Sequence, residues 1–202
     1  PPMVMIDNPA PETVVIPGGL VVFQGSATDW EDGEIPAGNL FWLSDIDGVL
    51  GAGPTLELNN LSPGLHTITF AALDSESEEA SMQTTVLVGV PAGLQVVPAA
   101  VSPLDPDLEN VQIVVSLPID YPVAEVDTDS LLLTIGGVEI TPLSVELADL
   151  NEDGVPDLLL TFAADDVLPA QAQPPGPGEW TIAGEMQNGM AVKGTAQVPV
   201  AG

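Results

Sequence analysis

Oxygen-bearing residues recur at alternate positions in residues 149–157, which read Asp-Leu-Asn-Glu-Asp-Gly-Val-Pro-Asp. A glycine, Gly154, follows the third of these residues and permits the sharp turn that would let the oxygens converge. Hard oxygen ligands at this spacing suit Ca²⁺. The predicted ligands are the side chains of Asp149, Asn151, Asp153 and Asp157 and the main-chain carbonyl of Val155.

This stretch resembles the first nine positions of an EF-hand calcium loop, and also the D-x-N-x-D-G-x-x-D loops of dockerin, integrin-type and thrombospondin-like calcium repeats. It departs from the EF-hand at the twelfth position, where Leu160 replaces the bidentate glutamate. The flanking residues 143–147 and 158–162 are short, apolar and β-prone, so we expect the loop to join two strands. The resemblance implies a calcium-pinned β-hairpin; the alternative is a solvated acidic turn without metal.

A second group of carboxylates is predicted at one end of the first half of the chain. Asp29, Glu31 and Asp32 follow an expected strand, and Asp74 ends a later strand that can return to the same end. Four carboxylates gathered there would repel one another unless they shared a cation, so we expect a second calcium site. A solvated acidic loop is the alternative.

The charge balance is extreme, with 30 Asp and Glu residues against one basic residue, Lys193, and a formal net charge of −29. A chain with so little positive charge cannot neutralise phosphates, which argues against nucleic acids and anionic membranes as partners. Cations are the favoured partners. Adaptation to high salt is a second explanation of this acidity, and it is compatible with calcium sites.

Catalysis finds little support in the sequence. There is no cysteine, which excludes disulfides, thiolate catalysis and zinc-thiolate sites, and the single histidine, His66, cannot build a zinc cluster. No G-x-S-x-G, H-E-x-x-H or phosphate-loop pattern is present. Neighbouring carboxylates are expected by chance in so acidic a chain. We therefore expect that the protein is not an enzyme.

The hydrophobic pattern predicts an all-β fold of two Ig-like β-sandwich domains in tandem. Short runs rich in Val, Ile, Leu and Thr are separated by turn residues, including 20 glycines and 21 prolines, and no helical periodicity is evident. The predicted domains are residues 1–91 and 92–202. The predicted strands are residues 4–6, 14–16, 20–25, 40–44, 65–72 and 80–90 in the first domain, and 95–97, 111–117, 131–135, 143–147, 158–162, 180–183 and 191–198 in the second.

Three sequence stretches carry a resemblance to PKD-type and bacterial Ig-like modules over about residues 3–90: residues 25–33 (GSATDWEDG), 41–45 (FWLSD) and 61–69 (LSPGLHTIT), followed by Asp74. The resemblance implies that Trp42 is the core tryptophan of the third strand. It also places His66 where such modules carry a corner tyrosine that bonds a nearby backbone group, so we interpret His66 as structural. Alternation then sends Ile68, Phe70 and Ala72 toward the core.

The second half resembles the Ig-like modules that end secreted microbial surface proteins. Gly136-Gly137 predicts a tight turn, and Asp45 and Asp47 more often mark a hairpin turn than a ligand pair. The proline-rich residues 169–177 favour an extended surface loop. A β-propeller is the competing fold for a calcium loop, but it would need the loop repeated in each blade, and it occurs once here.

Two functional hypotheses follow. The first is an extracellular, calcium-rigidified subunit of a surface filament, fibre, surface layer or adhesin stalk. It would form a homo-oligomer or polymer by strand donation from the β-prone residues 3–6 or 197–200. The second is an accessory region of a larger secreted enzyme or adhesin that binds a cell-surface glycan or protein, with Trp30 or Trp180 as a stacking platform, although aromatics are only 4% of the chain.

The sequence shows no apolar run long enough to span a bilayer and no leader pattern at its start. We therefore expect a secreted chain without membrane insertion, from which any signal has been removed.

Overall fold

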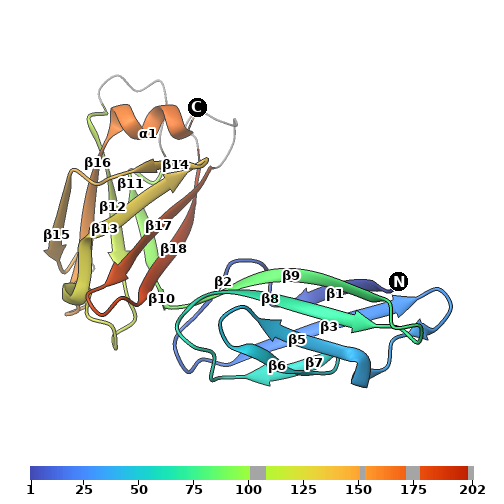
Figure 1. Cartoon of the computed structure of the whole chain (residues 1–202). Helices are drawn as coiled ribbons and strands as arrows, with labels where there is room; N and C mark the ends of the chain where they lie inside the picture. The colour runs from blue at the N-terminus through green and yellow to red at the C-terminus, as the bar shows by residue number, and fades with distance from the viewer. Residues whose placement is uncertain (101–107, 151–152, 172–177, 200–202) are drawn as a thin grey trace. The chain divides into compact units, whose positions relative to one another are not determined.

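The computed structural model describes residues 1–100, 108–150, 153–171 and 178–199 (Figure 1). The chain divides into two compact units, unit 1 (Pro1–Gly89) and unit 2 (Val90–Gly202). Each is an Ig-like β-sandwich of two packed sheets, which confirms the predicted fold class. The sequence-based division left Val90 and Pro91 in the first domain, whereas these residues form β10 (Val90–Pro91) and pair with β18 (Ala191–Val198) of unit 2.

Unit 1 is built from a four-stranded and a five-stranded sheet. In the first sheet β3 is central, with β1 on one side and β4 and β7 as its other partners; in the second the order is β2-β9-β8-β5-β6. A short 3-10 turn (Ala37–Asn39) leads into β5. The strands are β1 (Met3–Asn8), β2 (Thr13–Val15), β3 (Val21–Asp29), β4 (Gly33–Glu34), β5 (Leu40–Ser44), β6 (Gly48–Ala52), β7 (Thr55–Leu58), β8 (Gly64–Leu73) and β9 (Glu79–Val88).

Three aromatic rings pack together in the core of unit 1. Trp42 stacks on Phe70, at a centroid distance of 4.3 Å, and contacts the tilted ring of Phe23, at 5.3 Å. Its indole N–H donates to the Gly53 carbonyl at 3.0 Å, so the one polar atom of the ring is satisfied inside the core. Gly25 is required by this packing, because a Cβ there would lie 2.6 Å from the Phe70 ring. Trp42 is thus the core tryptophan that the sequence predicted.

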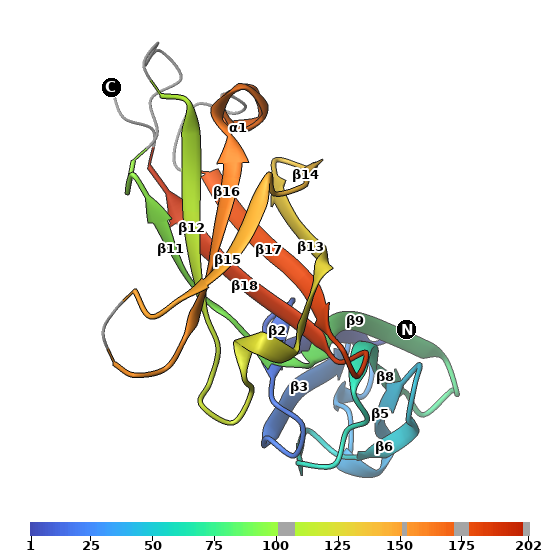
Figure 2. The ribbon, with the colours of Figure 1, turned by 90° about the vertical axis from the view of Figure 1, so that its left-hand side faces the viewer.

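Unit 2 has the sheet orders β10-β18-β17-β13-β14 and β11-β12-β16-β15. The views in Figures 1 and 2 show these strands as two facing layers. Gly136 and Gly137, with φ of 57° and 84°, make the two-residue turn between β13 and β14, as predicted. Besides β10 and β18 the strands are β11 (Gly93–Val97), β12 (Asn110–Ser116), β13 (Val126–Ile135), β14 (Val138–Ile140), β15 (Ser144–Ala148), β16 (Asp157–Ala163) and β17 (Gly178–Met186), and Val123–Glu125 is a 3-10 turn.

A short helix, α1 (Ala164–Gln171), lies at one end of unit 2 and contacts β12 and β16 of one sheet and β13 and β14 of the other. Its buried residues Ala164, Val167 and Ala170 are three positions apart and so share one face. The prediction of an extended loop over residues 169–177 is wrong for residues 169–171, which form the last part of this helix. Residues 172–177 of that predicted loop are outside the described residues. In the described part of the chain, no helix is long and apolar enough to cross a membrane.

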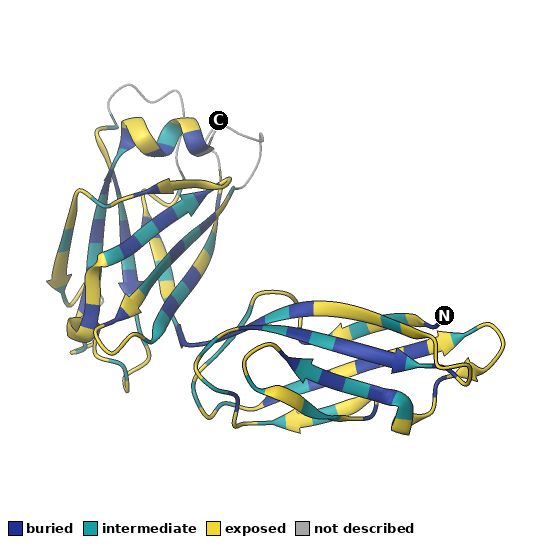
Figure 3. Cartoon of the chain, in the orientation of Figure 1, coloured by how far each residue is buried: buried dark blue, intermediate teal, exposed yellow. Residues whose placement is uncertain are grey.

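Alternation of buried and exposed residues along the strands follows the predicted pattern (Figure 3). On β8, His66, Ile68, Phe70 and Ala72 are buried, as expected. Every predicted strand overlaps an observed one. The predicted N-terminal donor lies in β1, which runs antiparallel to β3 of its own unit. In the predicted C-terminal donor, 197–200, Gln197 and Val198 pair with β17, and residue 200 lies outside the described residues.

Candidate functional site

The acidic stretch 149–157 connects β15 to β16, whose pairing brings Ala148 opposite Asp157, so the predicted hairpin is confirmed. Backbone N–H groups of the loop donate to the carboxylate of Asp149, its first residue. Asp149 accepts the N–H of Asp153 on Oδ1 at 3.1 Å and the N–H of Gly154 on Oδ2 at 3.0 Å. Gly154 has a φ of 86°, the left-handed conformation that the sequence required of it. Asp153 Oδ1 in turn accepts the Val155 N–H at 2.7 Å.

Asp157, the last predicted ligand, is only 3% exposed at the first position of β16. Its Oδ2 accepts the Leu150 N–H at 3.4 Å, so it ties the two ends of the loop together from the sandwich side. Asp157 also lines a cavity of about 200 Å³ with Gln95, Ser116 and Leu150. The predicted ligand Asn151 lies outside the described residues.

The described carboxylates of this loop have the donor chemistry of a calcium site, because each carboxylate oxygen can accept more than one partner. Among the residues that the structure describes, however, no three His, Asp or Glu side chains gather in an arrangement that could hold a metal ion. Calcium binding here therefore stays a prediction, and the ligand set would have to include oxygens such as that of Val155.

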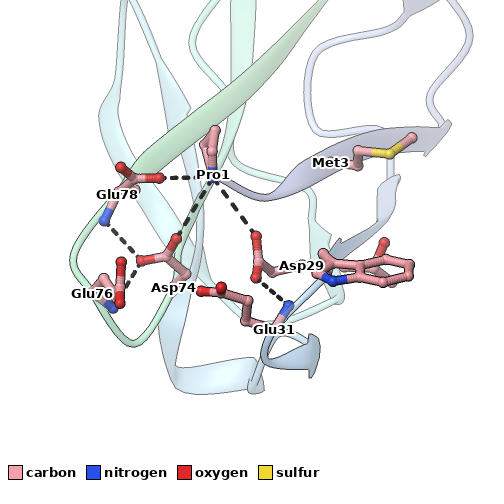
Figure 4. A pocket seen from close by; sticks show the side chains of 9 residues that line it. Pro1, Met3, Asp29, Glu31, Asp74, Glu76 and Glu78 are labelled. Atoms are coloured by element: carbon pink, nitrogen blue, oxygen red, sulfur yellow. Dashed lines mark hydrogen bonds and ion pairs between the residues drawn. The ribbon is translucent and has the colours of Figure 1, made fainter.

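At one end of unit 1 the structure brings together two of the four predicted carboxylates and adds a third. Asp29, at the end of β3, and Asp74, after β8, both face the Pro1 nitrogen, at 3.7 and 4.0 Å. Glu78, in the turn before β9, lies 2.7 Å from the same nitrogen (Figure 4). These side chains border a cavity of about 570 Å³, called the acidic pocket below, whose other lining residues include Met3, Thr28, Trp30, Glu31 and Glu76.

The other two predicted ligands differ from each other. Glu31 lines the acidic pocket, but Asp32 turns to the neighbouring loop, where its carboxylate accepts the Ser75 N–H and hydroxyl, each at 2.8 Å. Asp74 is 9% exposed, and its Oδ1 accepts the N–H groups of Glu76 and Glu78 at 2.9 and 2.8 Å. Asp32 and Asp74 thus shape the loop that carries Glu78.

Backbone hydrogen bonds lower the pKa of the Asp29 carboxyl. The Glu31 N–H is the largest cause that lowers the Asp29 pKa, helped by the Asp32 N–H and the positive Pro1 nitrogen, while burial opposes them. On the other side of the contact, the hydrogen bond to Glu78 raises the pKa of the Pro1 ammonium.

His66 lies in a sealed polar cluster near the opposite end of β8. It is fully buried, and its Nε2–H donates to the Ser62 carbonyl at 2.7 Å. Because a carbonyl only accepts, the proton is on Nε2, and Nδ1 accepts the Ser44 hydroxyl at 2.7 Å. Asp47 Oδ2 is 3.9 Å from Nδ1. The bond to a backbone carbonyl four residues earlier confirms the predicted structural role of His66.

The Ser44, His66 and Asp47 side chains have the residue types of a nucleophilic triad but not its access. Ser44 is also buried, and its oxygen accepts the N–H groups of Ile46 and Asp47 at 3.1 and 3.2 Å. Asp47 accepts the Ser62 N–H at 2.9 Å. The Ser62 hydroxyl and this N–H, with His66 as a smaller cause, lower the Asp47 pKa. The cluster closes the β5–β6 turn against the start of β8.

The three tryptophans, weighed as core or stacking residues, separate clearly. Trp42 and Trp180 are fully buried, whereas Trp30 is 98% exposed and borders the acidic pocket. Sequence reasoning did not single out Glu78. Its position depends on the tight turn between β8 and β9, in which Leu73 pairs with Glu79 and the Asp74 N–H donates to the Glu78 carbonyl at 3.1 Å.

Solved structures of tandem β-sandwich modules match the chain over nearly its whole length, at low identity. The fibronectin(III)-like modules of CbhA from Clostridium thermocellum are 14% identical, with 98% of this chain and 94% of that chain covered and a TM-score of 0.36. Domains 5-6 of the S-layer protein SbsC are 16% identical, with 99% and 98% covered and a TM-score of 0.28.

The glucan utilisation protein SGBP-B of Bacteroides ovatus, solved in complex with a mixed-linkage heptasaccharide, is 12% identical, and its TM-score is 0.34. That match covers 98% of this chain, which spans about half (48%) of that one. No family model matches the chain, and no curated protein is significantly similar to it. All three TM-scores are below 0.5, so the assignment of the fold rests on the sheets described above.

Proposed function

We propose that this chain is a non-catalytic, calcium-binding structural segment of an extracellular surface protein, such as a filament, fibre, surface layer or adhesin stalk. The observation that carries the proposal is the hairpin loop 149–157, which curls around Asp149 through two backbone N–H groups and begins β16 with a buried carboxylate, Asp157. A net charge of −29 makes cations its natural partners.

Two further features support a structural role. Of the side chains with the residue types of a triad, Ser44 and His66 are buried inside unit 1 and His66 is held at both ring nitrogens, while Asp47 is partly exposed. Each unit also has its own hydrophobic core, as expected of modules that serve as spacers.

The calcium proposal is confined to unit 2. In unit 1 the predicted second site does not gather its four carboxylates, because Asp32 accepts hydrogen bonds from Ser75 in the neighbouring loop.

The test is the thermal unfolding of unit 2 in millimolar calcium and in excess chelator. An ion that binds only the folded loop at a concentration of about 100 times its Kd adds about 2.7 kcal/mol of stability. Asp149→Asn should remove most of the calcium-dependent shift, and the control Glu146→Gln, an exposed carboxylate on β15, should leave it intact. A melting temperature indifferent to chelator would refute calcium binding.

Self-assembly by strand donation requires a further step in this structure. The residues predicted as N-terminal donor form β1, which is antiparallel to β3 of its own unit, so donation would require β1 to leave that pairing. We propose assembly through this outermost strand of its sheet. Sedimentation velocity of the chain with and without residues 1–12, in calcium, tests it: unimpaired assembly of the truncated chain would count against β1.

The second candidate function is binding of a glycan or a protein. One observation favours it: Trp30 is 98% exposed at the rim of a cavity. Trp180, the other proposed stacking residue, is fully buried and cannot serve. Glycan-array binding that disappears in Trp30→Ala would establish the glycan version of this function.

A further inference from the structure

The five-stranded sheet of unit 1, β2-β9-β8-β5-β6, carries almost none of the acidity of the chain (Figure 1). All five strands lie within the described residues, and among them only Glu79, the first residue of β9, is an Asp or Glu. The other sheet of the same unit contains Asp7, Asp29, Glu34 and Glu57. Carboxylates are thus segregated between the two sheets of one sandwich, although the whole chain has a formal net charge of −29.

The outer side of this sheet is called the uncharged face below. It is formed by the side chains of β5, β6, β8 and β9 that point away from the core. On β8, His66 and Ile68 face the core, so Leu65, Thr67 and Thr69 point outward by alternation. The face therefore mixes apolar side chains with hydroxyl and amide groups and exposes no carboxylate at its centre.

Strand register aligns these uncharged side chains in a row across four strands. Val49 on β6 pairs with Leu43 on β5, and Leu43 pairs with Thr69 on β8. Thr69 in turn pairs with Gln83 on β9. Val49 is 73% exposed, and Leu65, further along β8, is 60% exposed. Apolar surface is thus open to solvent on this side of the sheet.

The polar side chains of the uncharged face already have partners on their own chain. Gln83 Nε2 donates to Thr69 Oγ1 at 3.1 Å, and Thr85 Oγ1 accepts the Glu12 N–H at 3.0 Å. Both hydrogen bonds can persist when the face is covered. Covering it therefore buries apolar surface at a low desolvation cost for these polar groups.

The size of the sheet suits a weak protein–protein contact. The longest strands, β8 and β9, have 10 residues each and so extend for about 33 Å, and five strands at about 4.8 Å spacing are about 20 Å wide. The sheet thus offers roughly 600 Å², somewhat less than the about 800 Å² that each partner contributes to a standard interface.

The distribution of charge selects an acidic partner for this face. A basic partner would be drawn to the sheet that contains Asp7, Glu34 and Glu57 instead. An acidic partner is repelled by every carboxylate-bearing surface and can approach only where carboxylates are missing. A second copy of the chain, with its own charge of −29, is such a partner, and its identical face can meet the first across a two-fold axis.

We propose that two copies of this chain associate through the uncharged face of unit 1, sheet against sheet, so that the acidic sheets of the two units lie on the outer sides of the pair. This contact goes beyond the proposed function. It leaves β1 paired with β3 and needs no ion at the loop 149–157 of unit 2. It can therefore hold or fail independently of calcium binding and of strand donation.

The experiment is sedimentation velocity of the full chain in chelator, from micromolar to millimolar concentration and at several NaCl concentrations. We expect a monomer–dimer equilibrium with a submillimolar Kd at high salt. The dimer should become more stable as salt rises, because at about 1 M salt the Debye length falls to about 3 Å and the repulsion between two acidic chains is screened. An interface built from ion pairs would weaken instead.

Two glutamine substitutions on opposite sheets form a matched pair. Gln83→Glu places a carboxylate in the uncharged face, and Gln24→Glu places one on the outer side of β3; both glutamines are exposed. Gln83→Glu should weaken dimerisation about tenfold or more, because the two-fold contact brings two like charges together, and Gln24→Glu should change it less than about twofold. Both variants keep the side-chain size at an exposed position, so thermal unfolding should show unit 1 intact.

Four results would overturn the proposal. The first is a chain that stays monomeric at every concentration and salt. The second is equal weakening by Gln83→Glu and Gln24→Glu, which would reduce the effect to net charge. The third is concentration-dependent NMR shifts that map to β3 or to unit 2 rather than to Leu43, Leu65 and Thr69. The fourth is loss of the dimer in a folded chain without residues 1–12, which would assign self-association to β1.

Discussion

The two units reach the same sandwich by opposite routes at their starts. In unit 1 the first strand, β1, joins the sheet of β3, and the next, β2, crosses to pair in parallel with β9, the last strand. In unit 2 the parallel partner of the last strand comes first, as β10 beside β18, and β11 then pairs with β12 in the other sheet. The opening segment thus supplies a strand to both sheets in each unit. Both sandwiches need one opening strand in each sheet, but the order of these two strands along the chain differs between the units.

The cores differ more than the topology. Unit 1 stacks Trp42 on Phe70 and beside Phe23, whereas the core of unit 2 is mainly aliphatic, with Trp180 and Phe162 among Val, Leu and Ile, and one end is covered by α1.

Both units carry carboxylates in their loops, and the groups that hydrogen-bond to these carboxylates can be compared. Backbone N–H groups hold the Asp149 carboxylate, and backbone N–H groups also hold Asp29 and Asp74. The same sandwich fold thus carries loops of different chemistry.

The largest expected effect separates the two cores. Trp42→Ala should cost unit 1 about 3–5 kcal/mol, because it leaves a large cavity beside Phe23 and Phe70 and removes the hydrogen-bond donor of the Gly53 carbonyl. Trp180→Ala should cost unit 2 a similar amount. Denaturant unfolding of each variant, followed by NMR signals from each unit, should show one destabilised unit at a time. Equal loss in both units from either substitution would show that they do not fold independently.

The next-largest effect tests the polar cluster of Ser44, Asp47 and His66, which has no counterpart in unit 2 because His66 is the single histidine of the chain. His66→Ala should cost about 2–4 kcal/mol, because the Ser62 carbonyl and the Ser44 hydroxyl both lose a buried partner and a cavity remains. Ser44→Ala, which deletes one hydroxyl, should cost about 1 kcal/mol. If His66→Ala were no more harmful than Ser44→Ala in urea titrations, the histidine would not be the structural anchor inferred here.

Much of this frame was readable in the sequence. Alternation placed His66, Ile68 and Phe70 on one face of β8, and Gly136-Gly137 marked a turn, because both signals are local. The sequence missed the elements that are stable only when paired with a neighbouring strand or packed on a sheet. The short strand β6, for example, contains two glycines and has little β-propensity of its own. Helix α1 contains Pro169, which masked the three-residue spacing of its buried face.

The candidate sites were predicted in part for the same reason. Local spacing identified the hairpin loop and its left-handed Gly154. Which carboxylates meet across loops depends on register, and no local pattern reveals that Asp32 bonds Ser75 while Glu78 reaches the pocket shared by Asp29 and Asp74. Exposure was equally hidden: Trp30 and Trp180 look alike in sequence, and only the packed sheets make one a surface residue.

A smaller effect concerns pH and sharpens the contrast between the units. The pKa of Asp47 is lowered in the folded state, first by the Ser62 hydroxyl, so its ionised form stabilises unit 1 above the unfolded pKa of about 3.9. This contribution is lost as the pH falls through the lowered folded value. Asp47→Asn should therefore cost about 1 kcal/mol at pH 7 and almost nothing near pH 2. Across this pH range the unfolding curves of unit 2 should be the same in Asp47→Asn and in the wild type. A pH-independent cost in unit 1 would mean that charge is not what Ser62 recognises.

The smallest expected effect on stability is that of Trp30→Phe, which should alter the free energy of unfolding of unit 1 by less than about 0.5 kcal/mol, because the side chain is 98% exposed. Its optical effect should nevertheless be large. Trp42 and Trp180 are buried, so the long-wavelength part of the native emission belongs to Trp30.

With Asp29, Glu31, Asp74 and Glu76 around the Trp30 indole, a cationic quencher such as Cs⁺ is concentrated near it and iodide is repelled. Cs⁺ should quench the red-edge emission more efficiently than iodide at low salt, and the difference should shrink as NaCl screens the field. Glu57→Gln should leave the ratio unchanged and Glu78→Gln should lower it; equal quenching by both ions in the wild type would mean that the carboxylates do not act on what approaches Trp30.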